Sequence, residues 1–155
     1  KNYLTKVMTF VNRTLTENFG YSIIKKQLKI ESVKNKGKYD DLEKADIYIM
    51  TNLRKLQPSP DPEENAAAYA GLQKGIDIWL QTLTKVEYKN TKADFNPKIA
   101  KFIYLNLIRL NVALGNKKEA EKYLNQLQEN LVDINLGNDE EKELQSMEKI
   151  IYKKN

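Results

Sequence analysis

The sequence predicts an all-α fold built from antiparallel helical hairpins, and three observations carry this prediction. Apolar residues recur at intervals of three and four along most of the chain, glycines and prolines separate these periodic stretches, and helix-capping residues follow the breaks. Alternating strand patterns bounded by hairpin turns do not occur, and the sequence contains neither Asn-Gly nor Asp-Gly. We therefore expect about six or seven helices.

The composition limits the chemistry that the chain can perform. Its 155 residues include 26 Lys and Arg, 21 Asp and Glu, and no Cys or His. This length fits a single all-helical domain over residues 1–155 with a real core. The missing residue types exclude disulfides, thiolate metal sites and Ser-His or Cys-His catalytic pairs. We expect no enzyme activity, no catalytic residue, no cofactor and no metal.

Three helices are predicted before residue 57. Their apolar stripes have helical spacing and consist of Leu4, Val7, Met8, Val11 and Leu15; of Ile23, Ile24, Leu28 and Ile30; and of Leu42, Ala45, Ile49, Met50, Leu53 and Leu56. Phe19 and Gly20 interrupt the pattern after the first stripe. Gly37 ends the second helix, because glycine adopts a left-handed conformation without a steric penalty.

The stretch 57–62 is the clearest break in the chain, since it holds three prolines in six residues. We expect it to separate an N-terminal helical part from a C-terminal part. Asp61 is the predicted N-cap of the next helix, with Pro62 at its first position and Glu64 bonding back to the cap. The apolar side of this long helix is predicted from Tyr69, Leu72, Ile76, Trp79, Leu80, Leu83 and Val86.

Two features of that long helix bear on packing. Gly71 and Gly75 weaken a helix by about 1 kcal/mol each relative to Ala, and their spacing predicts that another helix passes close to this face. Trp79 lies on the apolar stripe, which favours a place in the core. A role in stacking on sugars or in a protein interface is the alternative.

The C-terminal part repeats one arrangement of breaks and starts. Asn96 and Pro97 open a fifth helix that ends at Leu114, and Gly115 closes it. The next helix is apolar at Ala120, Tyr123, Leu124, Leu127 and Leu131. The last follows Gly137 and is predicted to turn Leu144, Met147, Ile150 and Ile151 inward and Glu143, Gln145, Glu148 and Lys149 outward.

Four capping boxes are predicted at helix starts. Each pairs a cap residue with a Glu three positions on, and they are Asp40 with Glu43, Asp61 with Glu64, Asn116 with Glu119, and Asn138 with Glu141. Acid pairs such as Asp40 and Asp41 could alternatively be catalytic carboxylates. Their positions in first turns, where carboxylates oppose the helix dipole, explain them without chemistry.

Residues 101–134 resemble one tetratricopeptide repeat, which is a helix, a glycine-led turn and a second helix over about 34 residues. The matching positions are Tyr104, Leu107, Gly115, Asn116, Ala120 and Leu124. The departures are Ile108 in a Gly/Ala slot, Asn111 in a Tyr slot, Leu127 in an Ala slot, and the lack of a terminating Pro. The segment is therefore similar to a degenerate repeat.

A weaker echo covers residues 21–58. Gly37 and its neighbours resemble the turn, Ala45 the small residue after it, and Pro58 the terminator. The resemblance implies helical hairpins stacked as a short right-handed superhelix whose inner face binds other molecules. It also implies a non-catalytic scaffold, adaptor or accessory subunit that binds a protein or peptide. A helical hairpin stack without repeat ancestry is the alternative.

The candidate partner-binding residues are Asn106, Arg109 and Tyr104. Asn106 and Arg109 lie three residues apart within an otherwise apolar helix, and the resemblance implies that such positions commonly face the concave groove. Arg109 would bind a partner carboxylate through two hydrogen bonds. The alternative is an Arg whose stem packs while its head reaches solvent or an internal Glu.

Two further functions remain open. Residues 1–56 hold 12 basic and 6 acidic side chains, and the lysines from Lys25 to Lys38 could attract an anionic polymer. Because Arg, the preferred reader of bases and phosphates, is missing from that stretch, we favour a solvated helix face over nucleic-acid binding. The other alternative is an accessory domain of a bacterial cell envelope that captures a ligand or glycan.

The composition, the apolar runs and the first residue give expectations about the origin of the chain and its compartment. Abundant Lys, Asn, Ile and Tyr with only three Arg is typical of an AT-rich bacterial genome. Apolar runs are shorter than the ~18–20 residues that span a bilayer, so we expect a soluble chain without a transmembrane segment. The start at Lys1, with no initiator Met, is interpreted as processing, which favours the cell envelope over the cytoplasm.

Overall fold

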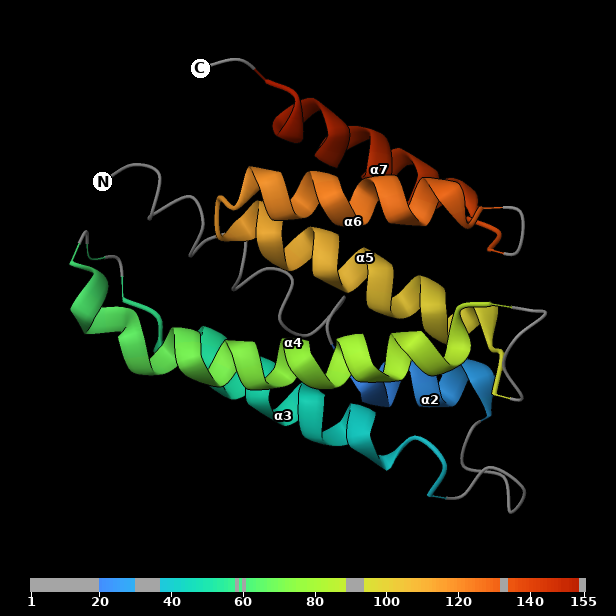
Figure 1. Ribbon diagram of the computed structural model, residues 1–155, viewed down its shortest axis with the longest axis horizontal. Helices are drawn as coiled ribbons and strands as arrows, with labels where there is room; N and C mark the ends of the chain where they lie inside the picture. The colour runs from blue at the N-terminus through green and yellow to red at the C-terminus, as the bar shows by residue number, and fades with distance from the viewer. Residues whose placement is uncertain are drawn as a thin grey trace. The chain divides into compact units, whose positions relative to one another are not determined.

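The computed structural model describes residues 20–29, 37–57, 59, 61–88, 94–131 and 134–153. Within these ranges the fold is all-α, with six α-helices, one short 3-10 helix and no strand (Figure 1). The predicted fold class is therefore confirmed. The first predicted helix, over residues 4–15, lies outside the described residues, as do Ile30 and Pro58.

The helices follow one another in chain order. They are α2 (Tyr21–Leu28), α3 (Asp40–Lys55), η2 (Pro62–Asn65), α4 (Ala66–Val86), α5 (Pro97–Ala113), α6 (Lys117–Glu129) and α7 (Asn138–Ile151). The chain divides into two compact units, Lys1–Thr82 and Leu83–Asn155, and the boundary falls inside α4. The prolines at 57–62 lie within the first unit.

The first unit contains α2, α3 and most of α4. Its buried apolar side chains include Tyr21, Ile24, Leu42, Ala45, Ile49, Leu53, Leu72 and Trp79. The core position predicted for Trp79 is confirmed, since the residue is only 1% exposed. The α2 helix ends at Leu28, followed by Lys29 in a left-handed conformation (φ 53°), and therefore stops before the predicted end at Gly37.

The α3 and α4 helices run antiparallel (Figure 1) and approach closely at two glycines of α4. A Cβ atom on Gly75 would lie 2.7 Å from the Ile49 side chain and 3.1 Å from the carbonyl oxygen of Ala45. A Cβ atom on Gly71 would lie 2.2 Å from the side chain of Asn52. The predicted close passage of another helix is thus confirmed, and that helix is α3.

The predicted caps are confirmed in part. Asp61 accepts a hydrogen bond from the backbone N–H of Glu63 (3.0 Å), with Pro62 at the first helical position as predicted. The residues from Pro62 form a 3-10 turn before α4 begins. Asn96 caps α5 by accepting from the N–H of Ile99 (3.1 Å).

The other predicted caps are wrong in detail. Helix α3 begins at Asp40 itself, so the capping position belongs to the residue before it. Helix α7 begins at Asn138, and its cap is Gly137, whose N–H donates to Glu140 (2.8 Å). Asn116 stands at the cap position of α6, but its side chain donates back to an oxygen of α5. Sequence spacing therefore located these helix starts to within one residue without giving the bonds.

The second unit contains an antiparallel hairpin, α5–α6, followed by α7 (Figure 1). Gly115 forms the turn with a positive φ of 77°, and Ala120 is fully buried where α5 and α6 meet. Most of α5 is buried. Helix α7 packs against both α5 and α6.

The predicted faces of α7 need two corrections. Leu144, Met147 and Ile151 are buried as predicted, but Ile150 is 45% exposed because the helix turns it away from this stripe. Glu143, predicted to point outward, forms an ion pair with Arg109 of α5. Among the described residues, no helix has the length and apolar character needed to cross a membrane.

Candidate functional site

Arg109 forms the centre of a polar network in the interior of the second unit. Its Nε and Nη2 donate to the two carboxylate oxygens of Glu143, at 3.0 and 2.5 Å. Its Nη1 donates to the side-chain oxygen of Asn106 at 2.9 Å. The guanidinium therefore binds a carboxylate through two parallel bonds, which is the strong geometry expected of Arg.

The two ends of this ion pair differ in exposure. The side chain of Arg109 is 10% exposed, whereas that of Glu143 is 29% exposed. A second ion pair, Lys101 with Glu140 (3.0 Å), also joins α5 to α7 and is exposed to a similar degree at its acidic end. Lys101 further donates to the backbone oxygen of Asn135 (3.2 Å). Two pairs of opposite charge thus bind the first turns of α7 to α5.

Asn106 lies beneath this network with no exposed surface. Its oxygen accepts the bond from Arg109, but its amide Nδ2 has no hydrogen-bond partner among the residues that the structure describes. A buried donor without an acceptor costs free energy, because water no longer satisfies it. The network therefore contains one buried donor, Nδ2 of Asn106, without an acceptor among the described residues.

Tyr104 belongs to a separate network on the same helix. Its hydroxyl donates to Glu87, just beyond α4, at 2.5 Å and accepts from the amide of Asn130 at 3.2 Å. Burial, together with the hydrogen bond to Glu87, raises the pKa of Tyr104 well above its ordinary value. Tyr104 is only 1% exposed, and its two hydrogen bonds connect the end of α6 to the segment after α4.

The structure thus brings two of the three predicted site residues together. Asn106 and Arg109 contact each other, while Tyr104 bonds elsewhere. Arg109 binds an internal Glu, Glu143, as the alternative expectation had it. A role of Asn106, Arg109 and Tyr104 in binding a partner stays a prediction. Sequence reasoning missed Glu143. The signal was its helical spacing from Glu140, Leu144 and Met147, which places all four on related faces of α7.

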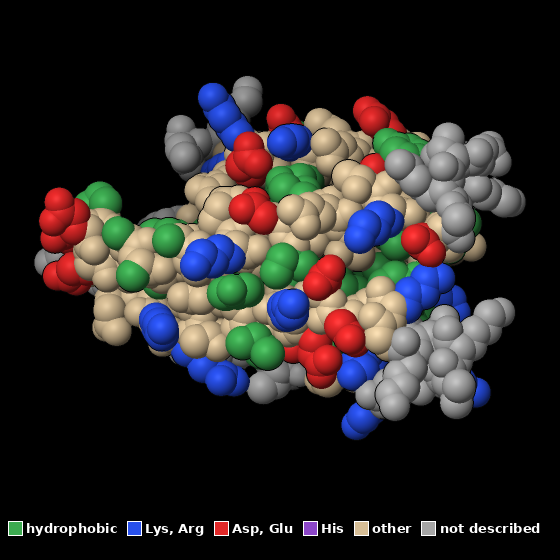
Figure 2. Space-filling model, turned by 60° about the horizontal axis from the view of Figure 1, so that its bottom comes forward, with side chains coloured by type: hydrophobic (Ala, Val, Ile, Leu, Met, Phe, Trp, Pro, Cys, Tyr) green, Lys and Arg blue, Asp and Glu red, His purple; other side chains and the backbone are tan. Residues whose placement is uncertain are grey.

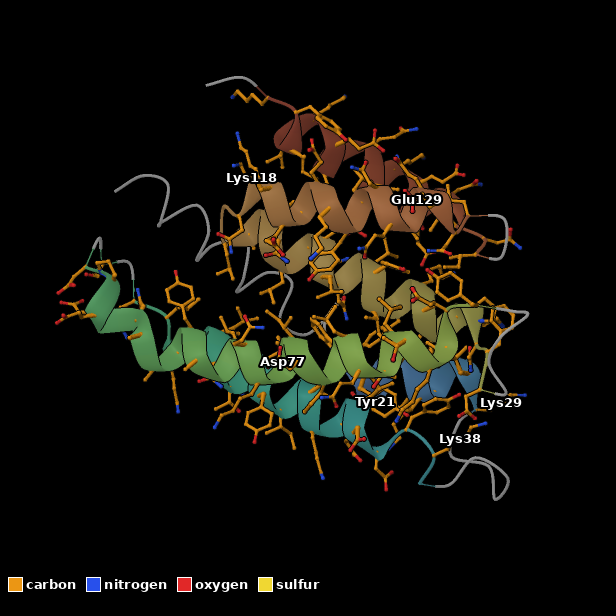
Figure 3. All side chains as sticks on the ribbon, in the orientation of Figure 1. Tyr21, Lys29, Lys38, Asp77, Lys118 and Glu129 are labelled. Carbon is orange, nitrogen blue, oxygen red and sulfur yellow. The ribbon has the colours of Figure 1, made fainter. Side chains whose placement is uncertain are left out.

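The predicted basic stretch from Lys25 to Lys38 is engaged in several internal contacts. The Nζ of Lys25 lies 3.6 Å from a carboxylate oxygen of Glu43 and 5.6 Å from the centre of the Tyr21 ring. Lys38 lies above the ring of Tyr39 (5.8 Å). Figure 3 labels Lys29 and Lys38, which come from the end of α2 and the turn before α3. The lysines at 34 and 36 lie outside the described residues.

Charge elsewhere on the surface is mixed. Figure 2 shows Lys and Arg side chains interspersed with Asp and Glu on the face that it displays. Within the described ranges, no group of three or more Asp or Glu side chains is placed to hold a metal ion. In comparisons with known proteins, no family model matches the sequence, and neither a curated protein nor a solved structure matches it.

Proposed function

We propose that the chain is a non-catalytic interaction module of the tetratricopeptide-like kind that binds a protein or peptide as a bacterial scaffold, adaptor or accessory subunit. One observation carries the proposal. Helix α6 runs antiparallel to α5, and α7 then runs in the direction of α5 and packs against both (Figure 1). This is how successive helices of a solenoid bury their faces, each unit against its neighbour.

Individual residues support the same proposal. The turn residue Gly115 has the positive φ that a tight hairpin needs, and Ala120, the small residue of the second helix, is fully buried. Asn111, in place of the family's Tyr, donates to the backbone oxygen of Leu107 (2.8 Å). Its own backbone oxygen accepts from the N–H of Asn116 (2.8 Å). The side-chain oxygen of Asn111 also accepts from the amide of Asn116 (3.4 Å), so the departure from the repeat pattern adds one long hydrogen bond at the turn.

The test is direct binding without turnover. The full chain, immobilised, is incubated with extract of the source bacterium, and each captured protein is produced separately and titrated by calorimetry. We expect at least one partner to bind reversibly with defined stoichiometry and to be recovered chemically unchanged. Chemical conversion of the partner would contradict a non-catalytic module, and a failure of every purified candidate to bind would contradict an interaction module.

A salt titration separates this function from binding of an anionic polymer. Neutralising phosphates releases counterions, so the affinity of a nucleic-acid binder falls steeply with salt. We expect single-stranded and duplex DNA to bind weakly and the protein partner to tolerate salt. Tight DNA binding that is lost between low and moderate salt would instead indicate that the chain binds nucleic acid through the lysines from Lys25 to Lys38.

A further inference from the structure

The C-terminal helix resembles a bound ligand in the way it contacts α5. We propose that α7 occupies, within its own chain, the docking site of an acidic amphipathic helix from a partner protein, and that Arg109 anchors that helix. The inference rests on the proposed function and names the chemistry of the partner.

The contacts between α5 and α7 are complementary in charge. Arg109 is nearly buried and binds both oxygens of Glu143, and Lys101 binds Glu140. These cations project from α5, and both of their carboxylate partners come from the first turns of α7. A helix that brings two carboxylates one turn apart would find the same two cations.

An apolar stripe follows these acids along α7. Leu144, Met147 and Ile151 lie at helical spacing and are buried, while the opposite side of α7 is exposed and, apart from Ile150, polar. An amphipathic helix that lays such a stripe into an apolar groove is a common mode of peptide recognition. The partner helix is therefore expected to carry two acids, one turn apart, ahead of an apolar stripe.

Asn106 has a buried donor that α7 does not use. Its Nδ2 is fully buried, lies in the same side chain that Arg109 contacts, and has no acceptor among the described residues. Glu143 uses both of its oxygens on Arg109 and leaves this donor unsatisfied. A ligand that supplies one more oxygen at this point would complete the network, and α7 does not.

The packing of α7 suits it to exchange with another helix. Its packing against α5 and α6 is less extensive than the packing of those two helices against each other. Elements with fewer contacts open locally at lower free energy than the core of the domain. Local opening of α7 would expose the cations of α5 while the α5–α6 hairpin stays folded.

The experiment uses the full chain and a labelled peptide with the sequence of residues 137–152. In the native chain α7 competes at the high effective concentration of a tethered helix, so the peptide binds weakly. Glu143→Gln removes the charge-assisted bonds of α7. We expect this variant to bind the peptide at least about tenfold more tightly than the native chain, as measured by fluorescence anisotropy.

Glu141→Gln is the matched control, because it makes the same change of side chain at an exposed position in the first turn of the same helix. We expect it to change peptide affinity by less than about threefold. Arg109→Met in the Glu143→Gln chain should abolish the gain, and circular dichroism checks that each variant stays folded. Equal peptide affinity of the native, Glu141→Gln and Glu143→Gln chains would overturn the proposal.

Hydrogen exchange on the full chain gives a second, independent measurement. We expect Glu143→Gln to speed exchange of α7 amides about tenfold and to leave α5 and α6 unchanged. Equal acceleration of all three helices would overturn the proposal, since it means global unfolding. A dimer that forms by exchange of α7 would overturn it too, because the occupant would then be a second copy.

The outcome also separates this inference from the proposed function. If a purified partner binds native, Glu141→Gln and Glu143→Gln chains with equal affinity, the interaction module is supported and the docking site on α5 is contradicted. If the peptide behaves as expected but no partner is found, the docking site stands and the proposed function lacks support.

Discussion

The pairs α3–α4 and α5–α6 are both antiparallel, yet they place their small residues differently. In α3–α4 two glycines of α4 lie against Ile49 and Asn52. In α5–α6 the glycine is in the turn, at Gly115, and the second helix carries a fully buried alanine, Ala120. The first arrangement lowers helix propensity, because its glycines lie inside a helix, whereas the second has its glycine outside the helices. Close packing thus has a different cost in each unit.

The largest expected effect is in the first pair. Gly75→Leu adds a side chain where a Cβ atom alone would already lie 2.7 Å from Ile49, so α3 and α4 must separate. We expect the free energy of unfolding to fall by about 3 kcal/mol. Urea unfolding followed by the fluorescence of Trp79, the single tryptophan, reports on this unit. Ala70→Leu, at an exposed position of α4, is the control and should be nearly neutral.

A double-mutant cycle makes this prediction more specific. Gly75→Ala gains about 1 kcal/mol of helix propensity but meets Ile49. Ile49→Val removes one of the two side-chain atoms in the way. We expect Gly75→Ala to be more favourable in the Ile49→Val chain by about 1 kcal/mol. If the effects of the two substitutions are additive, α3 moves as a whole to make room for the new Cβ atom. The contrast between the two helix pairs would then be wrong.

The next effect concerns the turn of the second pair. Gly115 has a φ of 77°, where any other residue places its Cβ against the backbone. Gly115→Ala should lower the free energy of unfolding by about 1–2 kcal/mol. Gly137→Ala is the control, because Gly137 has an ordinary φ of −74°. Urea unfolding followed by far-UV circular dichroism compares the two, and equal losses would contradict the argument from φ.

A smaller effect distinguishes two helix starts of the second unit. Asn96 accepts a bond from the N–H of Ile99, whereas the amide of Asn116 donates to Asn111 at 3.4 Å. Asn96→Ala should cost about 1 kcal/mol of stability and Asn116→Ala only a few tenths. Thermal unfolding of both variants measures the difference. A larger loss at Asn116 would indicate that its bond to Asn111 stabilises the turn more than the 3.4 Å distance implies.

Much of the fold could be predicted from the sequence, because helix stripes and breaks are local signals. Gly115, between two apolar helical segments, predicted the turn of a hairpin, and the spacing of Gly71 and Gly75 predicted a neighbouring helix. Cap bonds could not be predicted as well. They depend on which nearby oxygen a side chain reaches, as Asn116 illustrates by turning back toward α5.

The candidate site was harder to predict, since it depends on contacts distant in sequence. The residues Asn106 and Arg109 were identified from their polarity within an apolar helix. Their partner Glu143 lies 34 residues after Arg109 and comes from another helix. The sequence analysis placed Glu143 on the outward face of α7, which is wrong, because the register of α7 against α5 brings Glu143 to Arg109.

The smallest expected effect contrasts the buried charges of the two units. In the second unit Arg109 and Glu143 neutralise each other. In the first, Asp46 of α3 is half-buried, and its Oδ1 has no hydrogen-bond partner among the described residues. Burial raises the pKa of Asp46, opposed by the backbone N–H of Tyr21 and reinforced by the nearby charge of Glu43.

A raised folded-state pKa means that the native state binds this proton more tightly than the unfolded chain does. The resulting stability is fully present below the unfolded pKa of about 3.9 and is lost as pH rises through the folded value. Asp46→Asn should therefore stabilise the first unit at neutral pH, and its advantage should vanish near pH 3. Urea unfolding at both pH values, followed by Trp79, measures this. An advantage that persists at low pH would mean that shape rather than charge limits stability at Asp46, and the contrast with the neutralised pair of the second unit would fail.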